Sequence, residues 1–479
     1  MDLHVNLTDR RDLAGQIYRQ IRAGVLEGRL RPGEALPPTR ELASRLEVSR
    51  NTVSVAYDRL TAEGFVTTRV GAGTFVAAGL SEFRGRPWRQ DGRSRIRTPE
   101  TARPLRPRPV WETIPDPPDL TDEPDFDFRA GSPDVRLFPY ETWRRLISRE
   151  LCAPAVGAGM YGDPAGHPGL RAAIARHVGV SRAVHSEAAD VIVTAGAQQA
   201  LDLISRVLLE PGATAAVEDP GYPPPRWLFA SQGVRVVGVP VDAEGLMVDA
   251  IPADARVVYV TPSHQFPLGL AMSLERRMAL LDWADRHDAV IVEDDYDSEF
   301  RYGGRPIEPL QSLDPGGRVL YVGSFSKVML PTLRLGFLVA PPSLRQALRA
   351  ARYVADWHHP QADQKALAAF IDEGLLARHI RKMRGEYQTR HEHIGRVLAR
   401  DFAGLLELVP SAAGLHLSAL LPEGADDRAV VRRAREAGVG LLALSQFFAG
   451  APRSGLVLGY GAIPRTRIEE GLARLRRAI

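Results

Sequence analysis

The sequence has a single cysteine, Cys152, among 479 residues. One cysteine cannot form a disulfide within the chain, and an isolated cysteine is more often a small core residue than a nucleophile. Hydrophobic residues make up 44% of the chain and charged residues 25%, which is enough apolar material for a sizeable core. The composition therefore excludes a disulfide-stapled protein and indicates a folded protein of a reducing compartment.

Long apolar runs are also missing. No stretch approaches the roughly 18 to 20 apolar residues of a membrane span, and the opening MDLHVNLTDRRDL lacks the apolar segment of a signal peptide. We therefore expect a cytoplasmic protein that does not enter a membrane. The length is too great for one typical domain and predicts two to four folding units.

Positive charge is concentrated at one end of the chain. The first 112 residues carry 20 arginines against 13 acidic residues, a balance of +7 in a chain whose total is +3. Such asymmetry is typical of a protein that binds a polyanion with one part. Solvated arginines in an arginine-rich protein would give the same count, so charge alone leaves both interpretations open.

Three helices and a hairpin are predicted near the N-terminus. Apolar residues recur at helical spacing over residues 13–26, and two capped helices follow, with Thr39 and Ser49 as the expected N-caps. The last helix should bury Val53 and Tyr57 and present Arg50 outward. Two β-prone runs, FVTTRV and GTFVA, are separated by Gly71, Ala72 and Gly73. This order predicts a winged helix-turn-helix over residues 1–79.

The remainder divides into a linker and two lobes. Residues 80–118 have no apolar periodicity and many Arg and Pro residues, which predicts an extended linker. Residues 119–342 alternate β-rich runs with helical segments, the pattern of a mostly parallel sheet covered on both faces. Residues 343–479 favour a smaller α+β lobe. The expected strands of the sheet are VIVTAG, RVVGVPV, RVVYVTP, AVIVEDD, RVLYVGS and LGFLVAP.

The segment LPPTRELASRLEVSRNTVSVAYDRLTAEGFVTTRVGAGTFV resembles the GntR family of bacterial regulators along its whole length. A recognition helix enters the major groove by its N-terminal end, where polar side chains reach phosphates and base edges and Arg suits guanine. Arg40, at the start of the preceding helix, is better placed for phosphate. The resemblance and this geometry predict double-stranded operator DNA as a partner, with contacts from Arg40, Ser49, Arg50, Asn51, Thr52 and Gly71.

The strongest chemical signal is the phrase RVLYVGSFSKVMLPTLRLGF. Lys327 follows an apolar strand, with Ser324 three residues before it and Arg334 seven after it. This arrangement resembles fold-type I aminotransferases, in which the lysine forms a Schiff base with pyridoxal phosphate while the serine and arginine hold the phosphate. Only an amine forms an imine, and a guanidinium matches phosphate geometry.

The same resemblance assigns the other cofactor contacts. Asp294 is expected to pair with the pyridinium nitrogen, Tyr296 to lie near the phenolic oxygen, and Tyr222 to stack on the ring. The helix after VTAG would offer backbone N–H groups of Ala197 and Gln198 to the phosphate. Tyr161, in YGDPAGHPGLR, would reach the phosphate of a partner subunit. No metal site is predicted.

A GntR-type reader joined to an aminotransferase-like domain resembles the MocR subfamily of GntR regulators. EDPGYPPP, TPSHQFPLG and EDDYDSEFRY are more similar to that subfamily than to free-standing aminotransferases. The resemblance implies a head-to-tail homodimer and a small-molecule effector.

Two positions depart from working aminotransferases. Phe266 stands where an asparagine usually touches the phenolic oxygen, a role that His264 or Gln265 could take over. Val457 stands where the arginine that grips the substrate carboxylate is expected, with Arg453 and Arg465 nearby. An unpaired buried carboxylate costs several kcal/mol, so ordinary amino acids should bind poorly.

Three functional hypotheses follow. The cofactor site could sense pyridoxal phosphate itself, as in pyridoxine-synthesis regulators of the subfamily, or it could sense an amine or amino acid through the cofactor. The third possibility is an active aminotransferase tethered to DNA. The missing arginine and the intact lysine favour the two sensors over the enzyme.

Overall fold

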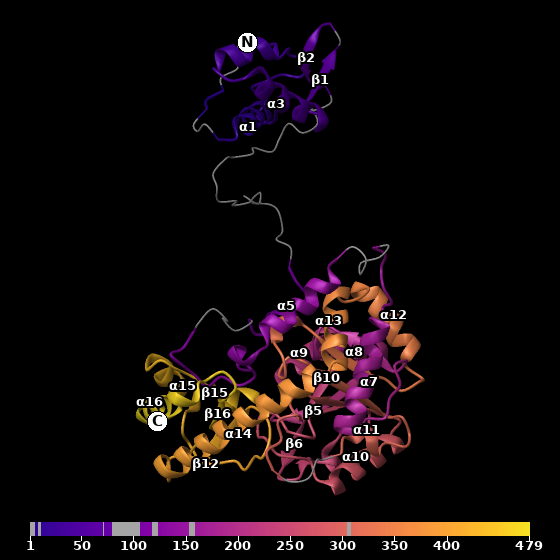
Figure 1. The fold of residues 1–479 in the computed structure, drawn as a ribbon, viewed down its shortest axis with the longest axis vertical. Coiled ribbons are helices and arrows are strands. Elements are labelled where there is room, and N and C mark those ends of the chain that lie inside the picture. The colour runs from indigo at the N-terminus through magenta and orange to yellow at the C-terminus, as the bar shows by residue number, and fades with distance from the viewer. Residues whose placement is uncertain are drawn as a thin grey trace. The chain divides into compact units, whose positions relative to one another are not determined.

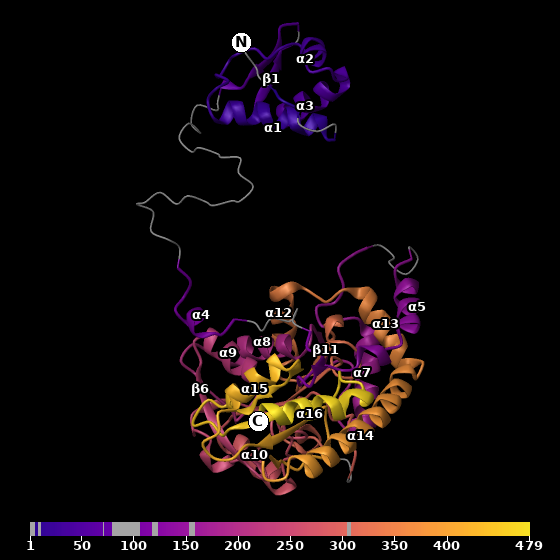
Figure 2. The ribbon, with the colours of Figure 1, turned by 90° about the vertical axis from the view of Figure 1, so that its left-hand side faces the viewer.

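We describe a computed structural model of the chain, shown in Figures 1 and 2. The structure describes residues 5–7, 11–69, 71–78, 106–116, 123–152, 159–303 and 308–479. The chain folds into two units, Met1–Arg106 and Pro107–Ile479, and each is described by itself. None of the helices in the described ranges is both long and apolar enough to cross a bilayer.

The N-terminal unit has the predicted order of three helices and a hairpin. Its elements are α1 (Leu13–Leu26), α2 (Thr39–Arg45), α3 (Arg50–Ala62), β1 (Val66–Arg69) and β2 (Gly73–Val76). The strands pair antiparallel, with Val66 opposite Val76. The helices share one core, in which Ile17, Leu42 and Leu60 are completely buried. A winged helix-turn-helix is therefore confirmed.

One of the two predicted caps in this unit is wrong. Ser49 caps α3, since its hydroxyl accepts a hydrogen bond from the backbone N–H of Thr52 at 3.1 Å. Thr39 is instead the first residue of α2, and Pro38 occupies the cap position without a side-chain hydrogen bond. Pro38 has the non-helical backbone of a cap residue, with φ −54° and ψ 142°, but its side chain has no hydrogen-bonding group, so α2 begins without a side-chain cap.

The C-terminal unit is built on an eight-stranded mixed sheet with the order β4-β11-β10-β9-β8-β5-β6-β7. The pairs among β10, β9, β8, β5 and β6 are parallel, whereas β11 runs antiparallel to both of its neighbours. The strands are β4 (Val191–Thr194), β5 (Thr214–Asp219), β6 (Arg235–Asp242), β7 (Gly245–Leu246), β8 (Ala255–Val260), β9 (Val290–Asp295), β10 (Val319–Ser324) and β11 (Gly336–Val339).

Helices cover both faces of this sheet. One face packs against α8 (Ala197–Leu208), α9 (Pro223–Ser231) and α12 (Arg345–Asp356). The other packs against α7 (Pro168–Arg182), α10 (Leu274–Arg286) and α11 (Leu310–Leu313). Beyond α7 lie α5 (Tyr140–Glu150) and α13 (Gln361–Asp372). The predicted mostly parallel sheet between helical layers is confirmed.

Strands β5 and β6 differ from the predicted pattern. β5 lies in the sheet between β8 and β6 but was absent from the predicted strands, because its sequence, TAAVED, is rich in alanine and ends in acids. β6 was among the predicted strands, yet Val239 is its only fully buried residue. Its outer neighbour is the two-residue strand β7, so β6 has the exposure of a sheet margin.

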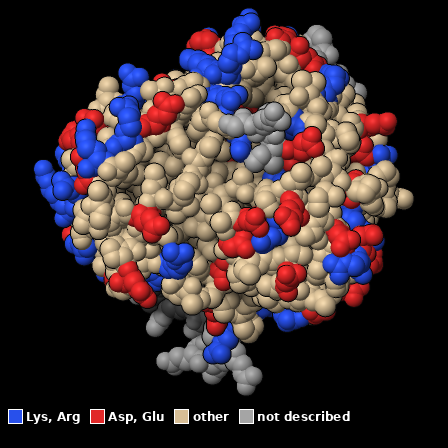
Figure 3. Space-filling model, turned by 90° about the horizontal axis from the view of Figure 1, so that it is seen from below, with Lys and Arg blue, Asp and Glu red and all other residues tan. Residues whose placement is uncertain are grey.

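A smaller sheet with the order β12-β13-β16-β15 forms the second lobe. Its strands are β12 (Glu407–Leu408), β13 (His416–Leu420), β15 (Leu442–Ala443) and β16 (Gly455–Gly459), and its helices are α14 (Leu375–Asp401), α15 (Asp427–Glu436) and α16 (Ile468–Ala478). An early strand, β3 (Phe126–Asp127), pairs with β14 (Val439–Gly440) beside them. On the face seen in Figure 3, acidic and basic side chains are interspersed with uncharged surface.

The predicted boundaries at residues 79, 118 and 342 stay predictions. Most of the predicted linker lies outside the described residues. Near its end, a short helix, α4 (Val110–Thr113), packs against α9, and Arg108 donates a hydrogen bond to the carbonyl of Ser231 at 2.7 Å.

Candidate functional site

Strand register brings together residues that are far apart in the sequence. Ser324 at the end of β10 lies opposite Gly336 of β11, and Gly336 lies opposite Thr194 at the end of β4. On the other side of β10, Val322 is level with Asp294 of β9. Ligands of α/β sheets bind at the carboxyl ends of parallel strands, and this edge carries most of the residues predicted from the sequence.

Lys327 lies just beyond β10 with a partly buried side chain. Its Nζ donates a hydrogen bond to the carbonyl of Gly131 at 2.6 Å. Burial lowers the pKa of this lysine, and the carboxylates of Asp297 and Asp294 act in the opposite direction. A lysine with a lowered pKa is more often the free amine, the form that attacks a carbonyl carbon.

Asp294 is buried and has one carboxylate oxygen left open. The hydroxyl of Tyr259 donates to Oδ2 at 2.7 Å, whereas Oδ1 has no hydrogen-bond partner among the described residues. Burial raises the pKa of Asp294 to about 7. A buried oxygen without a partner is costly, so this position suits a ligand that presents an N–H group.

The start of α8 forms an unfilled cradle for an anion. Gly196, the N-cap, has a φ of 83° and provides no side-chain cap, so the first N–H groups of the helix, at Ala197 and Gln198, remain available to a ligand. Arg334 donates to the carbonyl of Ala195 at 2.6 Å, and its guanidinium would lie 3.0 Å from a Cβ added at Gly196. Helix N-termini of this kind bind phosphate.

Ser324 stands at the edge of this cradle. Its hydroxyl accepts a hydrogen bond from the backbone N–H of Ser326 at 3.1 Å and lies 3.0 Å from the Ser326 hydroxyl. Gly336 is required between the strands, because a Cβ there would lie only 2.7 Å from the Cα of Gly196. Ser324, Arg334, Ala197 and Gln198 thus surround one point of the sheet edge.

Tyr296 and His264 contact each other. The Tyr296 hydroxyl donates to the backbone carbonyl of His264 at 2.8 Å and lies 3.0 Å from its Nδ1. The same Nδ1 is 3.1 Å from both carboxylate oxygens of Asp297. His264 therefore positions Tyr296, and Asp297 orients His264. Asp297 was not among the residues predicted from the sequence.

His416, on β13, was also missed. Its ring lies 4.8 Å from that of His264, and its Nε2 is 3.0 Å from the carbonyl of Pro267. Burial lowers the pKa of His416 well below its usual value, which keeps the ring neutral. The ligand atoms of His264, Asp297 and His416 lie within 4.8 Å of one another, the proximity of a possible metal site. All three side chains already take part in hydrogen bonds, which favours a hydrogen-bonded cluster.

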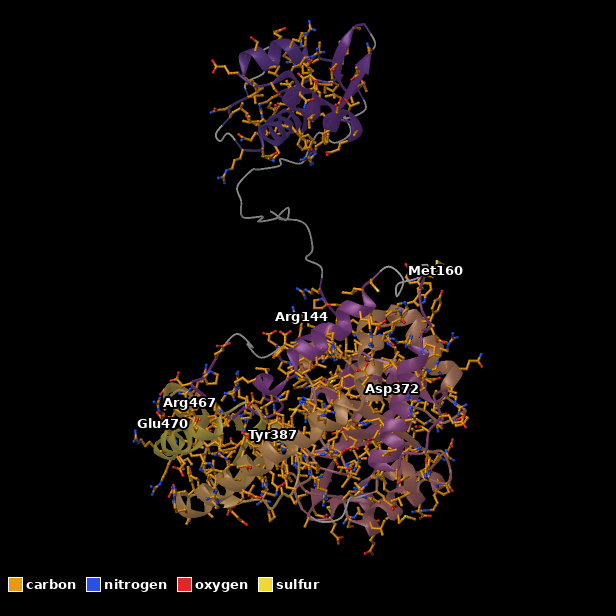
Figure 4. The ribbon with its side chains drawn as sticks, in the orientation of Figure 1. Arg144, Met160, Asp372, Tyr387, Arg467 and Glu470 are labelled. Atoms are coloured by element: carbon orange, nitrogen blue, oxygen red, sulfur yellow. The ribbon has the colours of Figure 1, made fainter. Side chains whose placement is uncertain are left out.

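The other two predicted tyrosines, Tyr222 and Tyr161, differ in their surroundings. Tyr222 is the N-cap residue of α9 and meets the ring of Phe266 edge to face at 5.7 Å. Burial raises the pKa of Tyr222 to about 12, so its hydroxyl stays protonated. Tyr161 is 72% exposed and stacks on Trp357 at 4.3 Å. Its neighbour Met160 projects from an outer edge of the unit (Figure 4), which leaves this segment accessible to another chain.

The residues predicted to contact DNA lie on α2, α3 and the wing. Arg40, Arg50 and Asn51 are exposed near the starts of their helices, and Gly71, with a φ of 79°, lies in the hairpin turn. The Nε of Arg50 is 3.4 Å from the hydroxyl of Thr39. The hydroxyls of Ser49 and Thr52 pair with each other at 2.8 Å. These two side chains therefore have less free hydrogen-bonding capacity than the sequence suggested.

Comparison with known families accounts for both units. Residues 138–466 match the model of aminotransferase class I and II, and residues 13–76 match the bacterial regulatory proteins of the gntR family. The probable rhizopine catabolism regulatory protein MocR of Rhizobium meliloti is 39% identical to this chain, over 97% of the chain and 93% of the relative. This chain belongs to the MocR-type regulators of the GntR family.

A second relative and two solved structures agree with this assignment. The pyridoxine biosynthesis transcriptional regulator PdxR of Corynebacterium glutamicum is 33% identical over 97% of the chain and 95% of its own length. The α-aminoadipate aminotransferase LysN of Thermus thermophilus covers 74% of this chain and 91% of its own, with 32% identity and a TM-score of 0.68. The kynurenine aminotransferase of Pyrococcus horikoshii covers 75% and 91%, with 29% identity and a TM-score of 0.69.

The MocR-type regulator therefore combines a GntR DNA-binding domain with a fold-type I aminotransferase domain. Domains of this fold type bind pyridoxal phosphate. The described residues fit this cofactor. The open Oδ1 of Asp294 suits the ring nitrogen, and the start of α8 with Arg334 suits the phosphate. The partly buried amine of Lys327 would suit the aldehyde.

The structure shows an apolar environment around Val457, the position where aminotransferases are expected to have an arginine. Val457, on β16, is completely buried and packs with Leu444 and Phe447. The two arginines that could have compensated, Arg453 and Arg465, are exposed. The regulator thus has an apolar side chain where the resemblance to aminotransferases implies a carboxylate-binding arginine.

Proposed function

We propose that this regulator binds paired operator half-sites as a cytoplasmic head-to-tail homodimer and adjusts its DNA affinity through an effector bound at the pyridoxal phosphate site. The observation that carries the proposal is a site with Lys327 and Asp294 in place and Val457 buried among apolar side chains. Such a site can hold the cofactor, but it has a buried valine where a carboxylate-binding arginine would be expected. The exposed Tyr161 supports the dimer, in which it would reach the partner's cofactor phosphate.

The residues of the chain have separate tasks in this proposal. Pyridoxal phosphate supplies an aldehyde that condenses reversibly with primary amines. Lys327 would hold the cofactor through its aldehyde, and Asp294 would orient the ring. Arg334 and the start of α8 would offset the charge of the phosphate, to which the Ser324 hydroxyl would donate a hydrogen bond. Tyr222 would cover the ring, and Tyr296, which His264 holds in place, would lie beside it.

Turnover is expected to be negligible. Transamination needs the substrate held with its Cα bond over the ring, and a carboxylate clamp supplies much of that positioning. Val457 cannot act as a clamp, so the domain senses instead of catalysing. The names of two relatives refer to rhizopine catabolism and to pyridoxine biosynthesis, so family membership alone does not select the effector.

The test titrates cofactor-free protein with pyridoxal phosphate, with and without operator DNA, and then adds amines and amino acids to the loaded protein. We expect ligand binding to change operator affinity, and operator DNA to change ligand affinity by the same factor, because the coupling is reciprocal. A response to the cofactor alone identifies the cofactor as effector. Steady conversion of an amino acid to its keto acid at about 1 per second or faster would instead show a tethered enzyme.

A further inference from the structure

The cofactor site is bordered by a wall of uncharged side chains centred on Phe266. Its ring lies 5.7 Å from Tyr222 and 6.3 Å from Tyr296, the two tyrosines expected at the cofactor ring. The same ring lies 5.0 Å from Phe447 and 5.3 Å from His416. Phe266 therefore connects the cofactor position with the small lobe.

Val457 completes this wall. It lies between Ser418 of β13 and Leu442 of β15 in the register of the small sheet, and its side chain belongs to the cluster that Phe266 packs against. Ala130 packs against the same cluster. The next residue, Gly131, accepts the hydrogen bond from Lys327, so the apolar wall begins one residue from the group that holds the lysine amine.

The polar atoms of the wall are already engaged. The hydroxyl of Ser418 donates to the carbonyl of Pro267 at 2.5 Å, and the Nε2 of His416 lies 3.0 Å from the same oxygen. A carboxylate placed against this surface would lose its hydration and gain no cation, which is strongly unfavourable. A hydrocarbon or aromatic group placed there would instead gain from burial.

We propose that the effector is a primary amine whose amine-bearing carbon carries uncharged, mainly apolar substituents and no carboxylate. This inference rests on the proposed function and narrows its ligand class. The amine is required for reaction with the cofactor, and the wall of Phe266, Phe447 and Val457 selects the remainder of the molecule. An α-amino acid with the same side chain binds poorly for lack of a partner for its carboxylate.

The experiment uses matched ligand pairs on the loaded wild-type protein. Each pair is an amino acid and the amine formed by removing its carboxylate, such as phenylalanine and 2-phenylethylamine or leucine and 3-methylbutylamine. Binding is followed by the change in cofactor absorption, and the response by operator affinity. We expect the amines to act at roughly 100-fold lower concentration than the amino acids, a ratio that corresponds to about 2.7 kcal/mol.

Val457→Arg should reverse this preference, because a guanidinium at this position pairs with the carboxylate. Val457→Leu is the matched control and should keep the preference for amines. Equal potency within the pairs, or a DNA response to the cofactor with none to any amine, would overturn the inference while leaving the proposed regulator intact. If neither the cofactor nor any amine or amino acid changed the operator affinity of the wild-type protein, the proposed function itself would be refuted. The wild-type pairs decide the question even if the arginine variant does not fold.

Helix α9 links the cofactor site to the end of the linker segment. Tyr222 caps the start of this helix, and at its other end the carbonyl of Ser231 accepts the hydrogen bond from Arg108. Helix α4 packs against α9 as well, and Phe229 within α9 is completely buried in the core. A short, well-packed helix moves as one body, so a displacement at Tyr222 reaches Ser231.

We infer that docking of residues 108–113 on α9 transmits the state of the cofactor site towards the DNA-binding domain. Arg108→Ala should leave cofactor affinity and unliganded operator affinity within about twofold of wild type. The change in operator affinity on ligand binding should shrink to less than half of its wild-type factor. The exposed Arg106, replaced by Ala, is the control and should retain the full effect. A second variant carries a Gly-Ser insertion after Arg106. If the ligand effect on operator affinity is undiminished in both this variant and Arg108→Ala, the inference is wrong.

Discussion

Lys327→Ala removes the visible absorption of the bound cofactor. The purified wild-type protein should be yellow, since Lys327 is the amine beside the phosphate cradle and the open carboxylate oxygen of Asp294. No other side chain at this edge of the sheet can form a carbon–nitrogen double bond with an aldehyde. The absorption spectrum before and after dialysis measures the loss, which we expect to be complete.

The chain allows an unusually clean control for this experiment. It contains only three lysines, Lys327, Lys365 and Lys382. Reduction with borohydride followed by peptide mapping should place the cofactor on Lys327 alone, and Lys382→Ala, at an exposed position on α14, should keep the yellow colour. Cofactor trapped on Lys365 or Lys382 in the wild-type protein would show that the site assignment is wrong.

Operator binding by Lys327→Ala tests whether the substitution affects sensing alone or also DNA binding. Lys327→Ala should retain DNA binding, because the helix-turn-helix has a core of its own around Leu42 and Leu60. The ligand-dependent change in operator affinity should disappear. Loss of DNA binding itself would indicate that the substitution disrupts folding.

Local patterns in the sequence were sufficient for most of the fold. The helices of the N-terminal unit follow from apolar residues at helical spacing, and α1 begins and ends where that spacing predicted, at Leu13 and Leu26. Strand β5 escaped prediction because alanines and acids do not form an apolar run, although its residues Ala215 and Ala216 are completely buried. Strand β3 has only two residues and exists through its pairing with β14, more than 300 positions away.

In the site, too, residues within one motif could be predicted from the sequence, whereas contacts between distant segments could not. Lys327, Ser324 and Arg334 share one motif, so their spacing was enough to predict them. The partners of the site residues come from distant parts of the chain. Tyr259 reaches Asp294 across the sheet, and Gly131 is 196 positions from Lys327. No local pattern marks Asp297 or His416, because their importance arises only from the side chains that folding places around His264.

Arg50→Ala relaxes the sequence preference of the regulator and lowers its affinity for the operator by about 1 to 3 kcal/mol, the value of one side chain that reads a base. The structure places Arg50 at the first position of α3, exposed, with its Nε beside the hydroxyl of Thr39. That is the end of a recognition helix that enters the major groove. The measurement compares operator and scrambled DNA by fluorescence anisotropy at several salt concentrations.

Arg40→Ala provides the contrast, since an arginine at the second position of α2 is placed for phosphate. It should weaken binding to both DNAs alike and reduce the salt dependence by about one released counterion. Arg59, near the other end of α3, pairs with Glu63 and covers the ring of Tyr18 at 4.0 Å, so Arg59→Ala should leave the preference unchanged. If Arg50→Ala instead weakened operator and scrambled DNA by the same factor, Arg50 would be a phosphate contact, and the bases would be read by other residues near the start of α3, beginning with the exposed Asn51.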